Sequence, residues 1–300
     1  MKNLIAARIH MYFHSVIYLI GMLLSFFSGL FGGISAYLAK EYYVGQPVMN
    51  CPFDDYILFF SLGAVIGIVT LCAGREFSDG TIRNKLVVGY TKPQVFLAES
   101  VAALVMMLPH YFAVMLPWFI GGNFFFAGIP LRYAVEWIVA LLGLYVAVTL
   151  ISVTFSYLIA HQAIGVIVAV GLCFGLYSLT SLFLGYYQNT ESREVMDTWY
   201  TLNDDGTYTE KEEICINSYY LPDGIRKGFV YLEHYVNPFS AMSDLESFGC
   251  ALDKSELSES DMQFQKKFIL ALDMAAWRTF AFGILLFIGG IRMFCRKNLN

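Results

Sequence analysis

The sequence predicts an all-α integral membrane protein with six transmembrane helices, an N-terminal interfacial helix and a small extracytoplasmic domain between helices 5 and 6. Hydrophobic residues make up 57% of its 300 residues and charged residues only 14%, whereas a soluble domain carries about 25% charged residues. Several apolar runs also approach or exceed the roughly 18 residues that cross a bilayer. Most of the chain is therefore expected to face lipid or other apolar helices.

The net charge of −5 is unevenly distributed along the chain. Residues 185–268 contain 16 of the 24 acidic residues but only 7 of the 19 basic ones. A nucleic-acid partner requires a strongly basic face, and no segment supplies one. We therefore expect no nucleic-acid binding.

The first turns are predicted to form an amphipathic helix in the headgroup layer. Its polar side carries Asn3, His10 and His14, with Lys2 and Arg8 near the edges, where they would meet anionic membrane lipid. Its apolar side comprises Leu4, Ile5, Ile9, Tyr12, Phe13 and Val16. The alternative is a short cytoplasmic extension of the first span.

Six apolar segments are predicted to cross the membrane. They are Ser15–Leu38, Tyr56–Ala73, Val95–Ile120, Tyr133–Ile159, Ala163–Leu184 and Phe268–Phe294. Nine Lys and Arg residues flank them on one side and two, Lys40 and Arg132, on the other, so the positive-inside rule predicts a cell-membrane protein with both termini in the cytoplasm. The domains expected are 1–184, containing a cytoplasmic loop at 74–94, then 185–267 outside, then 268–300.

Small residues recur at four-residue spacing in four of these spans. Such ladders predict close helix packing, within the chain or across a dimer, because small side chains let backbones approach in lipid. They are Ser25/Gly29/Gly33, Gly63/Gly67, Gly143/Ala147 and Gly171/Gly175.

Residues 185–267 are too rich in aromatic side chains for a disordered tether. We expect a small folded domain here, with a helix over Ser255–Phe268 leading into the last span. If this segment is exported, Cys215 and Cys250 can form a disulfide, although their spacing alone does not decide the pairing.

Catalytic motifs are absent from the sequence. It contains no P-loop, no H-E-x-x-H and no G-x-S-x-G, so neither an enzyme activity nor a cofactor or metal is expected in this chain. His10 and His14 have a metal-ligand spacing, but a solvated helix face explains them better.

Three ionisable residues in the predicted spans are candidates for a substrate path. His110 and Arg278 lie deep in the third and sixth spans, and Glu136 lies in the fourth. Buried ionisable groups in membranes are costly and mark functional sites. Alternatively, His110 bonds a carbonyl freed by Pro109 or Pro117, and Arg278 reaches the headgroups or pairs with Glu136.

The loop after the second span holds the densest charge in the apolar part of the chain. Ser78 or Asp79 is expected to cap a short helix on which Ile82, Leu86 and Val87 share a face, and Gly89 to end it in the left-handed conformation. A second helix is then expected to start with Thr91 as cap, Pro93 in the first turn and Gln94 completing a capping box.

The stretch Arg75–Glu99, "REFSDGTIRNKLVVGYTKPQVFLAE", resembles the signature of ABC-2 type exporter permeases. The residues that match are Glu76, Gly80, Thr81, Arg83, Gly89, Thr91 and Lys92. The six-span layout and the interfacial N-terminal helix are also similar to that family. The acidic segment between the last two spans departs from it, because the family often has short re-entrant helices there.

The resemblance implies a permease subunit that exports a substrate and is driven by a separate ATP-binding subunit, which itself binds ATP and Mg²⁺. That subunit would dock on the loop after the second span. The residues implied to contact or position it are Glu76, Asp79, Gly80, Thr81, Arg83 and Lys85. A second permease copy or a sister permease would complete a dimer. The alternative is a membrane receptor or sensor that binds a ligand through the external domain.

Overall fold

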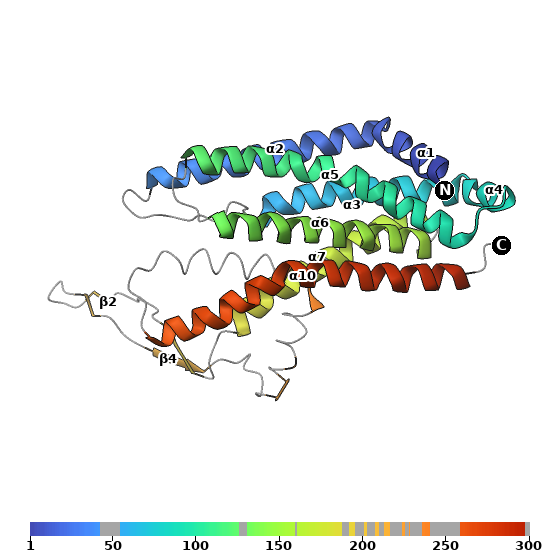
Figure 1. Cartoon of the computed structure of the whole chain (residues 1–300). Helices are drawn as coiled ribbons and strands as arrows, with labels where there is room; N and C mark the ends of the chain where they lie inside the picture. Colours follow the sequence, from blue (N-terminus) through green and yellow to red (C-terminus); the bar gives the residue numbers. More distant parts are fainter. Residues whose placement is uncertain are drawn as a thin grey trace.

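The fold is a bundle of long helices that run side by side (Figure 1). The computed structural model describes residues 1–42, 55–125, 131–159, 161–187, 192–195, 201–202, 208–209, 213–216, 224–225, 228, 236–240 and 259–297. Its helices are α1 Lys2–Phe13, α2 Val16–Tyr42, α3 Asp55–Ser78, α4 Thr81–Val87, α5 Lys92–Phe125, α6 Leu131–Ile159, α7 Gln162–Tyr187 and α10 Glu259–Arg296. Five of the six predicted spans lie entirely within one of the long helices, and the first begins at Ser15, one residue before α2.

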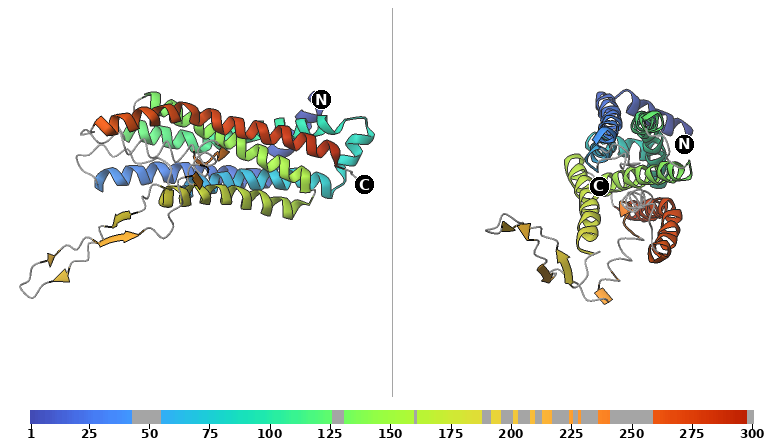
Figure 2. Two further views of the ribbon diagram at one scale, coloured as in Figure 1. Left: turned by 90° about the horizontal axis from the view of Figure 1, so that it is seen from below. Right: turned by 90° about the vertical axis from the view of Figure 1, so that its left-hand side faces the viewer.

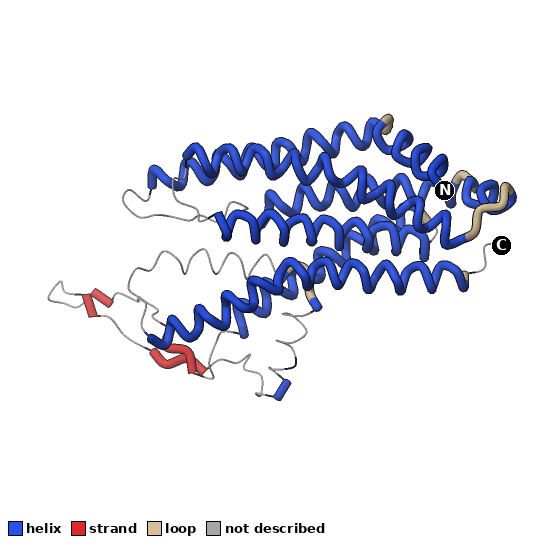
Figure 3. The backbone as a smooth tube through the Cα atoms, viewed as in Figure 1, coloured by secondary structure: helices blue, strands red, loops and turns tan. Residues whose placement is uncertain are grey.

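Four short strands lie at the end of the bundle away from α4 (Figure 3). Strand β1 (Ser192–Val195) pairs antiparallel with β4 (Glu213–Ile216), and β2 (Thr201–Leu202) pairs antiparallel with β3 (Tyr208–Thr209). Cys215 lies in β4, opposite Arg193 of β1, but Cys250 and most of the predicted external domain lie outside the described residues, so the predicted disulfide stays a prediction. The helix expected before the last span is present, since α10 begins at Glu259 and continues without a break.

Five helices in the described part of the chain are long and apolar enough to cross a membrane. The qualifying stretches are Phe60–Ser78, Lys92–Pro117, Ile138–Ile159, Gln162–Thr180 and Trp277–Arg296. The described part of α2 qualifies only together with α1, from which it is bent by 66°, and the pair would then be a sixth span. A membrane protein is therefore supported, and the complete six-span layout stays a prediction.

The core lies around α6, which packs against α3, α5, α7 and α10. Figure 2 shows α6 between α7 and α10 in the view along the bundle. Within its membrane-spanning stretch 72% of α6 residues are buried, against 22% for α7, so α7 is a peripheral helix with a large free surface.

Two of the predicted ladders pack as expected. A Cβ at Gly29 would lie 2.5 Å from the Val114 carbonyl oxygen, so only glycine allows α2 to approach the α5 backbone this closely. A Cβ at Gly143 would lie 2.0 Å from Thr279 Oγ1, which shows the same close packing of α6 on α10. The other two ladders, Gly63/Gly67 and Gly171/Gly175, face open space in the described structure.

The turns around α4 correct part of the expected capping. The N-cap is Gly80, with φ 67°, and no side chain of Ser78 or Asp79 caps the helix. Glycine fits this position because it adopts left-handed φ without a steric penalty. The end of the helix is as predicted, with Gly89 at φ 105°, and the Thr91 N–H donates to Gln94 Oε1 at 2.9 Å, as the capping box requires.

Candidate functional site

A cluster of buried charges ties α1, α3 and α5 together at the end of the bundle that carries α4. The side chains of Arg8, Glu76 and Glu99 are only 4%, 6% and 1% exposed. Arg8 Nη1 lies 2.8 Å from Glu76 Oε1, and Arg8 Nε is ion-paired with Glu99. Lys85 of α4 forms a second ion pair with Glu76. We call Arg8, Glu76, Lys85 and Glu99 the charged cluster.

Two tyrosines complete the hydrogen bonding of these carboxylates. Tyr12 Oη donates to Glu99 Oε1 at 2.5 Å, and Tyr157 Oη of α6 donates to Glu76 Oε2 at 3.2 Å. Burial and the negative charge of Glu99 raise the pKa of Tyr12, so its phenol remains a donor at neutral pH. A buried charge is stable only when it is paired and hydrogen-bonded, and both carboxylates meet that condition.

Arg8 has a different place from the one predicted. The helical wheel placed it at the edge of α1 toward lipid, whereas it lies on the buried side with Leu4 and Tyr12. Burial alone would lower its pKa, but Glu99 and Glu76 outweigh burial and the pKa is raised, so the guanidinium stays charged. The two carboxylates that hold it come from other helices, which a wheel of α1 does not include.

The short helix α4 exposes one side and buries another. Ile82 is buried and Leu86 is half-buried, while Val87 and Val88 are 87% and 78% exposed. The expectation that Val87 shares the buried face is therefore wrong. It fails because α4 ends at Val87, where the chain turns toward Gly89.

The loop residues implied by the resemblance divide into two groups. Asp79 and Arg83 are exposed and remain available to a partner, whereas Glu76 is buried and can act only by positioning other groups. Gly80 forms the turn before α4, and Thr81 Oγ1 donates to the Glu76 carbonyl at 3.1 Å, fixing α4 to the end of α3. Lys85 links α4 to the charged cluster.

A second buried polar group lies midway along the bundle. Ser25 Oγ lies 2.9 Å from His110 Nδ1, Ser61 Oγ donates to Ser25 Oγ at 3.0 Å, and Ser61 Oγ lies 2.5 Å from Tyr145 Oη. All four side chains are fully buried. We call Ser25, Ser61, His110 and Tyr145 the neutral chain, because it joins α2, α3, α5 and α6 without a formal charge on serine or tyrosine.

The direction of these bonds assigns the His110 tautomer. Ser61 has one proton and gives it to Ser25, so Tyr145 donates to Ser61 and Ser25 donates to His110 Nδ1. The proton of neutral His110 then lies on Nε2, for which the described residues offer no acceptor. Neither ring nitrogen forms the predicted bond from His110 to a proline-freed carbonyl, because Nδ1 is bonded to Ser25 and Nε2 has no hydrogen-bond partner among the described residues.

Two of the three path candidates have described side chains, and they lie in different helices with different neighbours. His110 is buried between α2 and α5, and Arg278 is buried in α10 next to Thr279, which contacts α6. Arg278 lies at the start of the membrane-spanning stretch Trp277–Arg296, and the interpretations that it reaches the headgroups or lines a substrate path both stay predictions. The side chain of Glu136 lies outside the described residues, so its pairing with Arg278 stays a prediction.

Sequence reasoning missed Glu99 and Tyr12 as site residues. Glu99 was detectable, because a carboxylate within an apolar span requires a buried partner. Within the described ranges, no group of three or more His, Cys, Asp or Glu side chains is arranged to hold a metal ion. His10 and His14 stack with ring centroids 3.9 Å apart.

Comparison of the sequence with protein-family models and with curated proteins gave no match, and neither did comparison of the fold with solved structures.

Proposed function

We propose that this chain is the membrane-spanning permease subunit of an ABC exporter, driven by a separate ATP-binding subunit that docks on α4 from the cytoplasm. The observation that carries the proposal is the two-sided character of α4. One side exposes Arg83, Val87 and Val88 at the end of the bundle, and the other is joined to the bundle through Ile82 and Lys85.

The exposed side of α4 suits a soluble protein partner. Exposed apolar side chains next to a cation favour a protein interface with a polar rim. Both termini lie at the same end as α4 (Figure 1), which fits a single cytoplasmic face carrying the positive flanks. ATP and Mg²⁺ would be bound by the partner, and the transport step would follow from its movement.

The charged cluster supplies a route from α4 to the bundle. A displacement of α4 acts on Lys85 and through it on Glu76, which Arg8 connects to Glu99 of α5. Ion pairs in a packed interior are shifted together, because separating them would leave a buried charge unpaired. The movement of a docked ATPase would thereby reach α1, α3 and α5 as a rigid-body tilt.

A second copy, or a sister permease, is proposed to cover the free side of α3 and α7. The ladders Gly63/Gly67 and Gly171/Gly175 have no neighbours there, and small-residue ladders in lipid are typical of helix–helix contacts. The substrate would pass along this contact between the two permeases.

Docking is tested by co-purification with a soluble ATPase carrying a P-loop, sought first in the reading frames adjacent to the one that encodes this chain. Arg83→Glu combined with Val87→Asp should reduce the amount of ATPase recovered at least tenfold. The first change reverses a charge, and the second places a carboxylate on an apolar position, both on the exposed side of α4 where the ATPase is proposed to dock. Arg292→Glu is the matched control, since Arg292 is also exposed but lies on α10. Equal recovery of the ATPase with all three proteins would contradict docking on α4.

Transmission is tested separately from docking with Glu99→Gln. This carboxylate is buried, so the variant should still bind the ATPase. It should lose most of the ATP-driven transport, because Arg8 loses its partner on α5. Transport at the wild-type rate, with the same ATP turnover, would contradict the proposed route.

A further inference from the structure

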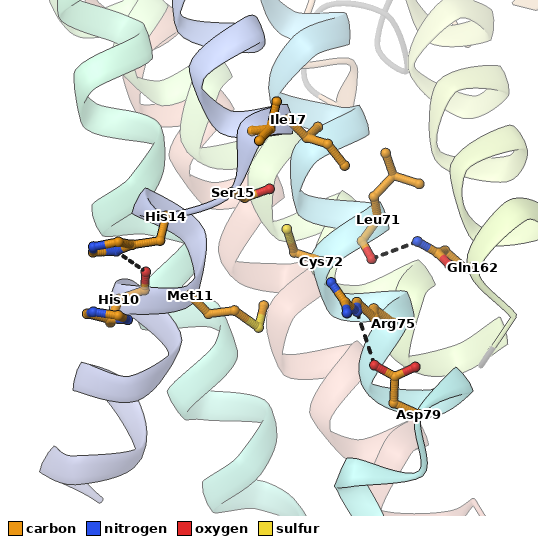
Figure 4. A pocket seen from close by; sticks show the side chains of 11 residues that line it. His10, Met11, His14, Ser15, Ile17, Leu71, Cys72, Arg75, Asp79 and Gln162 are labelled. Atoms are coloured by element: carbon orange, nitrogen blue, oxygen red, sulfur yellow. Dashed lines mark hydrogen bonds and ion pairs between the residues drawn. The ribbon is translucent and has the colours of Figure 1, made fainter.

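The bend between α1 and α2 borders a pocket of about 810 Å³. Its walls come from the end of α1, the start of α2, the end of α3 and the first residue of α7 (Figure 4). Figure 4 shows Met11 extending from α1 toward Arg75 of α3. Sites that bind small molecules have volumes of about 300–1,000 Å³, so the pocket is large enough for an organic ligand.

Polarity changes along the pocket in the direction of the helices. Leu71, Arg75 and Asp79 follow one another at intervals of one turn, since Asp79 N–H still bonds the Arg75 carbonyl at 2.9 Å. The polar members lie at the end of α3, and Leu71 lies about 6 Å further into the span. Ile17 of α2 lines this inner part as well. Two polar residues, Ser15 and Gln162, also lie there, and Gln162 Nε2 donates to the Leu71 carbonyl at 3.1 Å (Figure 4). A ligand here would place a polar group outside and an apolar group inside the bilayer.

The polar end carries one positive and one negative group. Arg75 Nε donates to Asp79 Oδ2 at 3.1 Å, and their side chains are 70% and 50% exposed. In the described structure no other protein acceptor contacts this guanidinium, so its terminal nitrogens are available to a ligand. Arg75 and Asp79 are thus presented together at the level where α3 ends.

We propose that this pocket binds a membrane phospholipid with an ethanolamine headgroup. The headgroup phosphate would accept hydrogen bonds from Arg75, and the ammonium group would interact with Asp79. The acyl chains would extend past Ile17 and Leu71. Basic pockets between membrane helices bind lipid headgroups, and a zwitterionic headgroup complements a cation beside an anion better than an anionic headgroup does.

The proposal does not rest on the ATPase partner or on the direction of transport. It requires only that α3 crosses a membrane and that its end lies at the headgroup level. It is therefore tested on the purified full-length chain alone, by native mass spectrometry in detergent. The two probes are phosphatidylethanolamine and phosphatidylglycerol with identical acyl chains.

The wild-type chain should bind the ethanolamine lipid about tenfold more tightly than the glycerol lipid. Arg75→Gln should weaken binding of the ethanolamine lipid about tenfold or more, the effect of losing a hydrogen bond to a charged group. Asp79→Asn should reduce the preference between the two lipids. Arg83→Gln, at an exposed position on α4 outside the pocket, is the matched control and should bind as the wild type does.

Two results would overturn the proposal. One is equal affinity of the wild-type chain for both lipids, which would show that the Arg75–Asp79 pair does not discriminate between the two headgroups. The other is that Arg75→Gln retains the affinity of Arg83→Gln. Because both arginines are exposed, neither substitution is expected to unfold the chain, and an unchanged circular dichroism spectrum would confirm this.

Discussion

The charged cluster and the neutral chain are both buried, apart from the partly exposed Lys85 of the charged cluster, yet they are built from different chemistry. The charged cluster lies at the end of the bundle next to α4 and contains two cations and two carboxylates. The neutral chain lies midway along α5 and α6 and contains hydroxyl groups and one imidazole. The free energy of burying a charge rises with distance from water, which fits the gathering of four charges at the end of the bundle; Arg278 of α10 is a buried charge that lies outside this cluster.

The charged cluster and the neutral chain also differ in the effect of removing one of their side chains. Losing one member of the charged cluster leaves an unpaired buried charge, whereas losing one member of the neutral chain leaves an unpaired dipole. The first is several times more destabilising than the second. The loss of stability caused by a substitution in each group therefore reports how well that group is shielded from water. The predictions below run from the largest expected loss of stability to the smallest.

Arg8→Met should have the largest effect. It removes the cation that holds Glu76 and Glu99, and breaking a buried ion pair costs about 3–5 kcal/mol. Thermal unfolding in detergent should show a correspondingly large loss of stability. Arg292→Met, at an exposed position in α10, should change the stability by less than about 0.5 kcal/mol. A loss below about 1 kcal/mol for Arg8→Met would mean that water reaches the charged cluster.

Combining Arg8→Met with Glu99→Gln should recover much of that loss. The double variant removes one cation and one carboxylate, and the Glu76–Lys85 pair remains balanced. Replacing both partners of a buried pair is often close to neutral, unlike removal of one partner. Additive losses in a double-mutant cycle would show that Arg8 and Glu99 do not interact in solution.

Ser25→Ala should have a smaller effect, because it breaks a neutral link. Hydrogen bonds between membrane helices contribute about 0.6 kcal/mol on average and at most about 1.7 kcal/mol. Ser28→Ala is the matched control, since the Ser28 hydroxyl donates only to the carbonyl of Leu24 in its own helix. A loss as large as that of Arg8→Met would mean that the neutral chain carries a charge on His110.

Separating Arg75 from Asp79 should have the smallest effect on stability. An exposed i,i+4 pair contributes about 0.3–0.5 kcal/mol and is screened by salt. A double-mutant cycle with Arg75→Gln and Asp79→Asn, measured in lipid-free detergent, should give a coupling energy in this range. A coupling above about 2 kcal/mol would place the pair in a dry environment, contrary to its exposure.

The sequence was sufficient for the positions of the long helices but not for their contacts. Runs of apolar residues fix where a span begins and ends, because the bilayer thickness sets their length. The face on which Arg8 lies depends on Glu76 and Glu99, which are 68 and 91 residues away in the chain. Periodicity within one helix contains no such information, so Arg8 was predicted to face lipid.

The loop around α4 also shows that local sequence preferences predict only part of the hydrogen bonding. The helix end at Gly89 and the Gln94 part of the capping box before α5 follow from local residue preferences, and these two predictions are confirmed. The N-cap was assigned to a polar side chain, whereas Gly80 takes the position. The side chains of Ser78 and Asp79 are instead used elsewhere, since Ser78 Oγ bonds the Gly74 carbonyl and Asp79 pairs with Arg75.

Met1 and the end of α10 lie at the same end of the bundle as α4 (Figure 1). Halves of a split reporter that are fused to the two termini through long flexible linkers can therefore reassemble within one molecule and give signal without any self-association. An assay of self-association needs the two halves on the same terminus of separately expressed chains. A bulky fusion at either terminus would also compete for space with any protein that approaches α4, so a short peptide tag is the better choice for co-purification.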